Sequence, residues 1–510
     1  MGNLFDRYFE ISDRGSNIGT EIWAGAVTFM SMSYILVLNP QILADGGVDP
    51  EQAVLSTAVS SGVGCLMCGV FARLPVGLSP VAYLSVYAVY GLMKGQGFTL
   101  SESLSCCYVA GIFLGFFAVM KIATYILRGI PRCIKFATVG GMGLLLTLVG
   151  LIQSGIVVSD TETFVRLGDL HNSSVWMCML GLVMLATLLF FQVWGSVLIV
   201  VLVLTITSWI MTNSWPARVF DIPDPVPAPD VYLDSFPQRI DAWLAVLAIM
   251  VVMVFDAAGT LNGLGTQAHL LTENGKIPGS MWMFISSAAS TLLAARLGCP
   301  PVLIHIESAA GIYEGARTGV AACVTGVLFF LSMFFAPLFG AVPFVAVAPI
   351  LILLGASMIG ESKGIDWNNI KEALPAFACI VMVPFAYSVA TGLFLGIGMS
   401  YILFLTTGEF VEYLPRCLCP WGREQSVTES TTLKTRDSEG FLGIEMHPIR
   451  SFRDNSQDQV YSGKPRTPSV TLFDDRDMMR RPNLLVGKGI VESMDEAQLI
   501  QEMNIDDDGF

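Results

Sequence analysis

Two acidic residues lie inside long apolar stretches of the 510-residue chain, and they are the side chains best suited to chemistry. Asp256 lies in the middle of IMVVMVFDAAGTLNGLG, and Glu307 lies in VLIHIESAAGI, after a Pro-rich stretch. A carboxylate within a membrane segment is costly to bury and therefore marks a functional site by default. Near the start of a short helix, unpaired N–H groups also favour an acid or a polar ligand. Such a group can exchange a proton or accept a hydrogen bond from a ring N–H, although each acid could instead be structural, with Glu307 capping its helix.

The other polar candidates have simpler interpretations. His305 precedes Glu307 by two residues, and we expect it to point to another face and to pack. Lys121 lies in an apolar run and can extend its ammonium toward the interface. Cys65 and Cys68 form a single C-x-x-C in an apolar stretch, which favours core packing over a metal or redox site. No ATPase, zinc-protease or hydrolase motif occurs in a plausible context, so we predict no enzyme, no cofactor and no metal.

The composition is that of a protein that crosses a membrane several times. Hydrophobic residues make up 53% of the chain and charged residues 14%, with a mean hydropathy of +0.63. Soluble domains carry about a quarter charged residues, so the composition argues against a soluble globular enzyme. The net charge of -14 also argues against a nucleic-acid partner.

The apolar runs predict an all-α polytopic membrane protein with 14 transmembrane segments. A bilayer core of about 30 Å needs roughly 20 apolar residues per spanning helix. Two further apolar stretches, at 79–93 and 302–314, are too short and too broken to span as plain helices, and they complete the fourteen. The longer runs lie at 22–44, 53–72, 104–127, 133–156, 176–191, 194–213, 241–265, 280–297, 317–336, 343–359, 373–386 and 388–407.

The two broken stretches are third and tenth in order, which places each one third in a set of seven. Pro75–Pro80 and Gly298–Val302 lead into them, and proline favours extended backbone there. Broken segments at corresponding positions of two halves indicate a transporter site between inverted repeats, although re-entrant hairpins without a ligand would give the same pattern. The predicted parts are a cytoplasmic N-terminus (1–20), the first repeat (21–213), an extracellular joint (214–239), the second repeat (240–407) and a disordered cytoplasmic tail (408–510).

Lys and Arg are more frequent in the loops that a cytoplasmic N-terminus would place inside. The positive-inside rule therefore predicts that both termini are cytoplasmic. The only sequon outside the tail, at Asn172, then falls outside the cell. The long tail and the sequon favour the plasma membrane.

Several ordered stretches resemble the AzgA-like purine permeases of the nucleobase-ascorbate and xanthine-uracil permease superfamily. They are TEIWAGAVTFMSMSYILVLNPQIL, LPVGLSPVAYLSVY, VFDAAGTLNGLG, IESAAGIYEGARTGVAA, VAVAPILILLGASMI and IDWNNIKEALPAFACIVMVPFAYSVATGLFLGIG, between about residues 16 and 407. The resemblance implies a seven-plus-seven inverted-repeat fold with core and gate domains, two short extended pieces at segments 3 and 10, proton-coupled purine uptake and a homodimer.

The resemblance also implies which residues surround the substrate. Glu307 and Ser308 match the tenth-segment motif, Asp256, Gly259 and Thr260 match F-D-x-A-G-T, and Ala82 and Tyr83 match the third-segment A-Y. The chain departs from the family where Val81 replaces an Asn, Met253 an Asp and Thr391 the Asp of A-D-G. The expected substrate-binding set is Glu307, Asp256, Ala82, Tyr83, Val81, Met253, Thr260 and Ser308, with Glu307 and Asp256 coupling protons.

The leading hypothesis is a secondary transporter that imports purine-like nucleobases by proton symport with alternating access. A carrier of another small solute or an anion on the same scaffold is the first alternative. The second is a membrane receptor or regulator that acts through its C-terminal tail and transports nothing.

Overall fold

A computed structural model describes residues 2–120, 131–160, 162–191, 193, 195–216, 218–223, 236, 238–272 and 277–407. Lys121 and the tail after residue 407 lie outside these residues, and the predicted joint at 214–239 lies partly outside them. The chain divides into two units, Met1–Leu403 with Lys488–Phe510, and Phe404–Gly487. The description below concerns the first unit.

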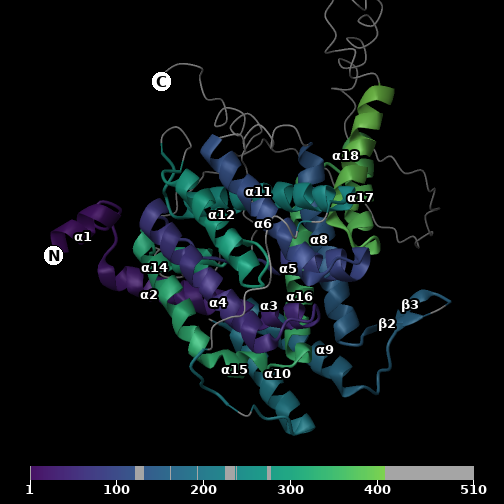
Figure 1. The fold of residues 1–510 in the computed structure, drawn as a ribbon, viewed down its shortest axis with the longest axis horizontal. Helices are drawn as coiled ribbons and strands as arrows, with labels where there is room; N and C mark the ends of the chain where they lie inside the picture. Colours follow the sequence, from purple (N-terminus) through teal and green to yellow (C-terminus); the bar gives the residue numbers. More distant parts are fainter. Residues whose placement is uncertain are drawn as a thin grey trace, which may run out of the picture. The chain divides into compact units, whose positions relative to one another are not determined.

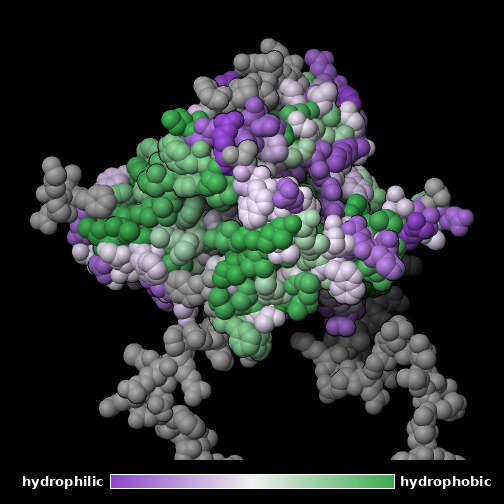
Figure 2. All heavy atoms as spheres, turned by 90° about the horizontal axis from the view of Figure 1, so that it is seen from below, coloured by the Kyte–Doolittle hydropathy of each residue, from purple (hydrophilic) through white to green (hydrophobic). Residues whose placement is uncertain are grey.

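The described residues contain nine helices that are long and apolar enough to cross a membrane (Figure 1). Many large apolar side chains on them are exposed, such as Leu180 (65%), Phe190 (81%) and Phe116 (52%). Figure 2 shows one face on which hydrophobic residues form broad continuous areas. Exposed apolar surface of this extent is typical of a lipid-facing protein. The nine spans are Ile18–Ala44, Pro50–Ala72, Leu100–Met120, Arg132–Gln153, Ser173–Phe190, Ile240–Gln267, Gly319–Gly340, Phe344–Gly364 and Val389–Thr406.

The helices pack as two groups, and each group draws on both halves of the sequence. The first group contains α2 (Ile18–Met32), α3 (Ile35–Ala44), α4 (Pro50–Met67), η1 (Cys68–Ala72), α6 (Leu100–Met120), α11 (Ile240–Gln267), α12 (Ser280–Arg296) and α14 (Gly319–Ser332). The second group contains α8 (Arg132–Gln153), α9 (Ser173–Phe190), α10 (Ser196–Thr212), α16 (Phe344–Ile359) and α17 (Ile370–Phe385). The remaining helical pieces are α1 (Gly2–Phe9), η4 (Met333–Phe335), α15 (Ala336–Gly340), η5 (Gly360–Gly364) and α18 (Val389–Thr406).

The third and tenth segments are broken, as the Pro-rich sequences predict. The third runs through strand β1 (Leu78–Pro80), α5 (Ala82–Val86) and the π-helix η2 (Tyr87–Gly95). The tenth runs through strand β4 (Val302–Ile304) and α13 (Ser308–Tyr313). The two strands pair antiparallel, with Ser79 opposite Leu303 at the centre. The two extended pieces therefore complete each other's hydrogen bonds, as backbone in a bilayer must.

Side chains from the neighbouring helices satisfy the backbone groups that this short ladder leaves open. The Ser287 hydroxyl donates to the Val302 carbonyl at 2.6 Å, and the Gly77 N–H donates to Ser308 Oγ at 2.9 Å. The Leu78 N–H donates to Cys65 Sγ at 3.2 Å. Cys65 and Cys68 are both buried, which confirms that this C-x-x-C packs in the core.

A short hairpin lies outside the helical bundle and was not predicted from the sequence. Strands β2 (Val157–Asp160) and β3 (Phe164–Leu167) pair antiparallel, with Val158 opposite Arg166. All four residues of β3 are exposed. Asn172 of the sequon follows the hairpin and caps α9, where its side chain accepts the Ser174 N–H at 3.0 Å.

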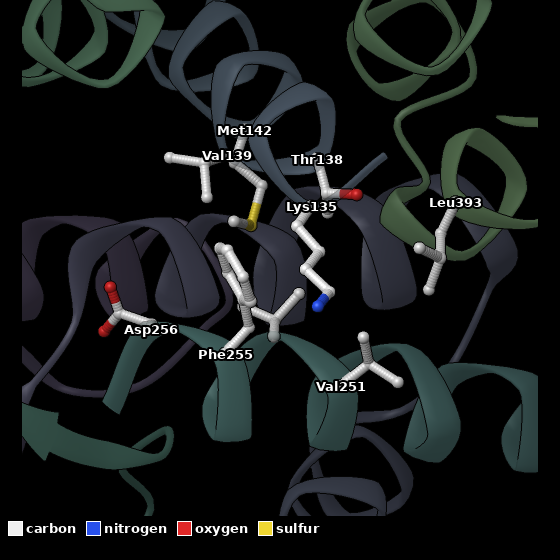
Figure 3. A pocket seen from close by; sticks show the side chains of 9 residues that line it. Lys135, Thr138, Val139, Met142, Val251, Phe255, Asp256 and Leu393 are labelled. Atoms are coloured by element: carbon white, nitrogen blue, oxygen red, sulfur yellow. The ribbon is translucent and has the colours of Figure 1, made fainter. Parts of the chain in front are cut away.

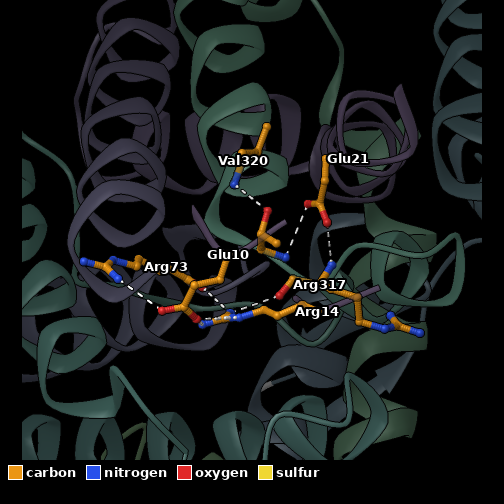
Figure 4. Close-up of polar contacts among 7 residues, drawn as sticks. Glu10, Arg14, Glu21, Arg73, Arg317 and Val320 are labelled. Carbon is orange, nitrogen blue, oxygen red and sulfur yellow. Dashed lines mark hydrogen bonds and ion pairs between the residues drawn. The ribbon is translucent and has the colours of Figure 1, made fainter. Parts of the chain in front are cut away.

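The N-terminal residues contact loops from both halves of the chain (Figure 4). The Arg14 guanidinium pairs with Glu10 at 2.9 Å and donates to the backbone carbonyls of Arg73 and Arg317. Glu21, fully buried, accepts the backbone N–H of Arg317 at 2.9 Å. We call the set Glu10, Arg14, Glu21, Arg73 and Arg317 the N-terminal cluster.

Candidate functional site

Glu307 lies where the tenth segment passes from β4 into α13. Its Oε1 accepts a 2.5 Å hydrogen bond from the hydroxyl of Tyr34, at the turn between α2 and α3. The Glu307 side chain makes no cap hydrogen bond to α13, although the residue occupies the N-cap position. The alternative in which Glu307 caps its own helix is therefore wrong.

The second oxygen of Glu307 is buried and has no hydrogen-bond partner among the described residues. The ring of His305 lies nearby, with its Nδ1 3.9 Å from Glu307 Oε2. His305 is buried, as expected, but it does not point away from Glu307 as expected. Its Nε2 is also buried without a described partner. An unpaired buried polar atom is costly, so these atoms mark a place for a ligand, a proton or water.

Asp256 approaches the same place from α11. Its carboxylate interacts electrostatically with Glu307 and with the hydroxyl of Tyr83 in α5. The Tyr83 hydroxyl is buried, and no described atom meets hydrogen-bond geometry with it. The structure therefore brings together three predicted residues, Glu307, Asp256 and Tyr83, from three separate segments.

The other predicted residues have varied surroundings. Ala82 is buried at the start of α5, and Val81 is buried at its N-cap. Ser308 is fully buried and holds the Gly77 N–H, so its hydroxyl is already engaged. Met253 is fully buried in the hydrophobic core. Thr260 lies one turn after Asp256 on α11 and is half-buried.

A hollow between α8 and α11 adjoins Asp256 (Figure 3). It has enclosed room for little more than one water molecule and is open on one side. Its lining is mostly apolar, which is common for small-molecule sites. The lining residues are Lys135, Thr138, Val139, Met142, Val251, Val252, Phe255, Asp256 and Leu393.

A buried polar network centred on α3 holds the third segment in place. The Asn39 amide in α3 donates to Thr57 Oγ1 at 2.7 Å and to Cys299 Sγ at 3.2 Å, and its oxygen accepts from the Ser85 hydroxyl at 2.6 Å. Asn39 therefore connects α4 and α5 to the residues before β4. Because all four side chains are buried, the network fixes where the two broken segments lie.

Two residues near the site were not singled out from the sequence. Tyr34 looks like an ordinary core aromatic in SMSYILVLNP, and only its partner, 273 residues away, gives it a role. Lys135 resembles the inner-loop cations of the positive-inside rule, but it lies in the first turn of α8 and lines the hollow. Among the residues described, no group of three or more His, Cys, Asp and Glu side chains could hold a metal ion.

Sequence comparison matches residues 19–395 to the Permease family. A putative permease of Methanocaldococcus jannaschii is 35% identical over 80% of this chain and 94% of its own length. The adenine permease AdeP of Escherichia coli is 30% identical over 81% of this chain and 93% of its own. The guanine/hypoxanthine permease PbuG of Bacillus subtilis is 31% identical over 80% of this chain and 96% of its own length.

Structural comparison identifies the fold. The transmembrane domain of the cyanobacterial bicarbonate transporter BicA superposes with a TM-score of 0.58 at 15% identity, over 75% of this chain and 97% of that domain. The murine Slc26a9 anion transporter superposes with a TM-score of 0.57 at 10% identity, over 76% of this chain and 68% of its own. The likeness confirms the predicted seven-plus-seven fold. The count of fourteen segments stays a prediction, since the described residues contain nine helices long enough to span.

Proposed function

Because the chain belongs to the xanthine/uracil permease family, we propose that it is a secondary transporter that imports purine-like nucleobases. The observation that carries the proposal is the set of unpaired polar atoms at the broken segments. Glu307 Oε2 and His305 Nε2 are buried without a hydrogen-bond partner among the described residues, and the Tyr83 hydroxyl, which interacts with Asp256, meets no hydrogen-bond geometry there. A planar base with ring N–H groups and ring nitrogens would satisfy them, and the relatives named as adenine and guanine/hypoxanthine permeases support that class.

In this proposal Glu307 accepts a ring N–H and exchanges the coupling proton. The Tyr34 hydroxyl donates a hydrogen bond to one carboxylate oxygen of Glu307, and the other oxygen is left for the substrate. Asp256 is close enough to influence Glu307 electrostatically, and in this proposal the two acids together handle the coupling proton. A carboxyl in such a place can pass from neutral to charged as the base arrives and leaves.

The two helix groups supply the moving parts of alternating access. The first carries β1, β4, Asp256 and Glu307, while the second covers them from the side of α8. Movement of one group against the other would open the site to each side of the membrane in turn. We place the carrier in the plasma membrane. Both termini are cytoplasmic, as the Lys and Arg distribution favours. The carrier is a homodimer, as the family resemblance implies.

The test is uptake of radiolabelled hypoxanthine, adenine, guanine, xanthine and uracil, with and without a pH gradient. Glu307→Gln keeps the shape and removes the exchangeable charge, so it should abolish gradient-driven uptake. The matched control is Glu162→Gln, the same change at an exposed loop position. Unchanged uptake by Glu307→Gln contradicts the assigned role. Stronger competition by unlabelled anions than by bases favours the carrier of another solute, and binding without transport in vesicles favours a receptor.

A further inference from the structure

Lys135 places a positive charge in the hollow at the edge of the candidate site. Figure 3 shows its ammonium directed into the space between α8 and α11, with Phe255 between it and Asp256 in this view. The ammonium lies 5.8 Å from the centre of the Phe255 ring, within the range of a cation–π contact. The other polar lining residues are Thr138 and Asp256.

Within the described residues, Lys135 contacts an aromatic ring but forms no ion pair. No described carboxylate lies within ion-pair distance of Lys135, and its charged neighbour on α8 is the cation Arg132. Thr138 does not offer a free donor either, since its hydroxyl donates to the Ile134 carbonyl at 2.8 Å. A half-buried ammonium without a carboxylate favours an acceptor from outside the protein.

We propose that Lys135 is a specificity-determining residue that donates a hydrogen bond to a carbonyl oxygen of the substrate. An ammonium has three donors and no acceptor, whereas a carboxylate is an acceptor only. Lys135 therefore presents a donor and Asp256 an acceptor in the lining of the hollow. A base with a carbonyl on one edge and ring N–H groups on another would complement this donor and this acceptor.

This inference rests on the proposed nucleobase transport and narrows its substrate class to oxopurines. Hypoxanthine carries a carbonyl oxygen where adenine carries an amino group. The amino group presents donors to a group that can only donate, and a site built for one hydrogen-bonding pattern rejects the other. The chain should therefore prefer hypoxanthine to adenine.

The test compares hypoxanthine and adenine uptake by the full chain and by Lys135→Met. Loss of a hydrogen bond to a charged group should lower the hypoxanthine-to-adenine ratio about tenfold or more. Lys135→Arg keeps the charge and should keep most of the preference. An unchanged ratio in Lys135→Met at normal surface expression overturns the inference, because a lysine that only reaches toward lipid would behave that way. If the wild-type chain transports no base, the proposed function itself fails.

A measurement on the unmodified chain keeps the inference testable if Lys135→Met does not fold. Unsubstituted purine lacks the oxygen of hypoxanthine and should inhibit hypoxanthine uptake at least about tenfold more weakly than unlabelled hypoxanthine does. Equal inhibition by the two overturns the role of the carbonyl.

A second, independent cluster joins the two helix groups at the far end of α8. Gln153, the last residue of α8, donates to the carboxylate of Asp45 and, at 2.8 Å, to the hydroxyl of Tyr90. The Tyr90 hydroxyl also donates to Asp45, and the Lys94 ammonium lies 4.0 Å from the same carboxylate oxygen. We call Asp45, Tyr90, Lys94 and Gln153 the α8 latch.

The α8 latch bridges elements that belong to different groups. Asp45 follows α3, which is in the first group, and Tyr90 and Lys94 lie on η2, which packs against α6 of that group, whereas α8 belongs to the second. Lys135 and Gln153 are 18 residues apart on α8, or about 27 Å at 1.5 Å per residue. The groups are therefore bonded at one end of α8 and separated by a hollow near the other. We infer that the α8 latch must break when this end opens during transport.

Crosslinking tests this inference. In the double variant Asp45→Cys with Gln153→Cys, a short bifunctional thiol reagent should abolish uptake, and reduction should restore it. Each single variant controls for the native cysteines and should keep its uptake under the same treatment. A crosslink confirmed by mass spectrometry that leaves uptake unchanged overturns the inference, because the two groups would then not separate there.

Discussion

Tyr34 and Glu307 are 273 residues apart in the sequence, and a 2.5 Å hydrogen bond joins them. The hydroxyl belongs to the turn between α2 and α3, and the carboxylate belongs to the broken tenth segment. One oxygen of Glu307 is thus held in place while the other is left buried and unpaired. This asymmetry divides the carboxylate into a fixed side and an unpaired side, and the donor on the fixed side can be removed alone.

Tyr34→Phe removes only the donor to Glu307. A hydrogen bond to a charged group contributes about 1.5–3 kcal/mol, so uptake at subsaturating substrate should fall about tenfold or more. The measurement is initial uptake at equal surface expression. Tyr8→Phe is the control, because the Tyr8 hydroxyl donates to the Val70 carbonyl on an exposed surface. Uptake within twofold of wild type would show that Glu307 needs no support from Tyr34.

Asn39→Asp should destabilise the protein more than Asn39→Leu. Leu leaves the partners with other acceptors, because Ser85 can still donate to the Val81 carbonyl and Thr57 to the Ala53 carbonyl. The expected cost of Asn39→Leu is about 1–3 kcal/mol. Asp instead buries a charge with no cation beside it, which typically costs more.

Thermal unfolding in detergent, followed by tryptophan fluorescence, gives the order of the Asn39 variants. The control is Asn262→Asp, the same change at an exposed position on α11. Equal midpoints for Asn39→Leu and Asn39→Asp would contradict the buried-charge argument.

Gly311→Ala should prevent α13 from packing against α2. An added Cβ would lie 2.0 Å from Thr28 Oγ1 and 2.6 Å from the Ala24 carbonyl oxygen. The backbone oxygen cannot rotate away, so we expect a loss of at least about 1–3 kcal/mol. Gly263→Ala is the matched control, because no atom lies within 4 Å of its added Cβ. Size-exclusion profiles should show aggregation for Gly311→Ala alone, and a monodisperse Gly311→Ala protein would rule the contact unimportant.

Ser308→Ala separates a structural hydroxyl from a substrate-binding one. The hydroxyl holds the Gly77 N–H at 2.9 Å beside the ladder. Its loss leaves a buried donor unpaired, at a cost of about 1–3 kcal/mol. We expect a lower unfolding temperature with little change in the KM for the base. Ser357→Ala, on an exposed part of α16, is the control. A raised KM with an unchanged unfolding temperature would instead support the substrate contact implied by the family resemblance.

The sequence predicts the fold better than the site. Local sequence signals mark the elements of the fold, whereas the contacts of the site join residues that are far apart in the sequence. Extended backbone is predicted locally by the prolines of Pro75–Pro80 and Gly298–Val302. The strands β1 and β4 begin within these stretches. Their pairing, Leu78 with Ile304, joins residues more than 200 positions apart, and no local signal sets that register. Asp256 and Glu307 stand out because charge is rare in apolar runs. Tyr34 does not stand out, since nothing in its own segment distinguishes a tyrosine that bonds a carboxylate from one that packs.

Lys135 and His305 show a related limit of sequence reasoning. A lysine at the edge of an apolar run looks the same whether it reaches toward lipid or into a hollow. Spacing along a helix predicts which face His305 takes only if the residue is helical, and His305 instead lies between β4 and α13. The roles of the site residues therefore remain predictions for the uptake experiments.

The N-terminal cluster has a consequence for the order in which the protein is made. Arg14 bonds the Arg317 carbonyl across 303 residues, and the buried Glu21 depends on the same loop. At about 5–20 residues per second, ribosomes need roughly 15–60 s to supply that partner. Until then Arg14 and Glu21 lack their contacts with Arg317, and a chain truncated before residue 317 never acquires them. The N-terminal cluster can therefore form in full only after synthesis has passed into the second half of the chain.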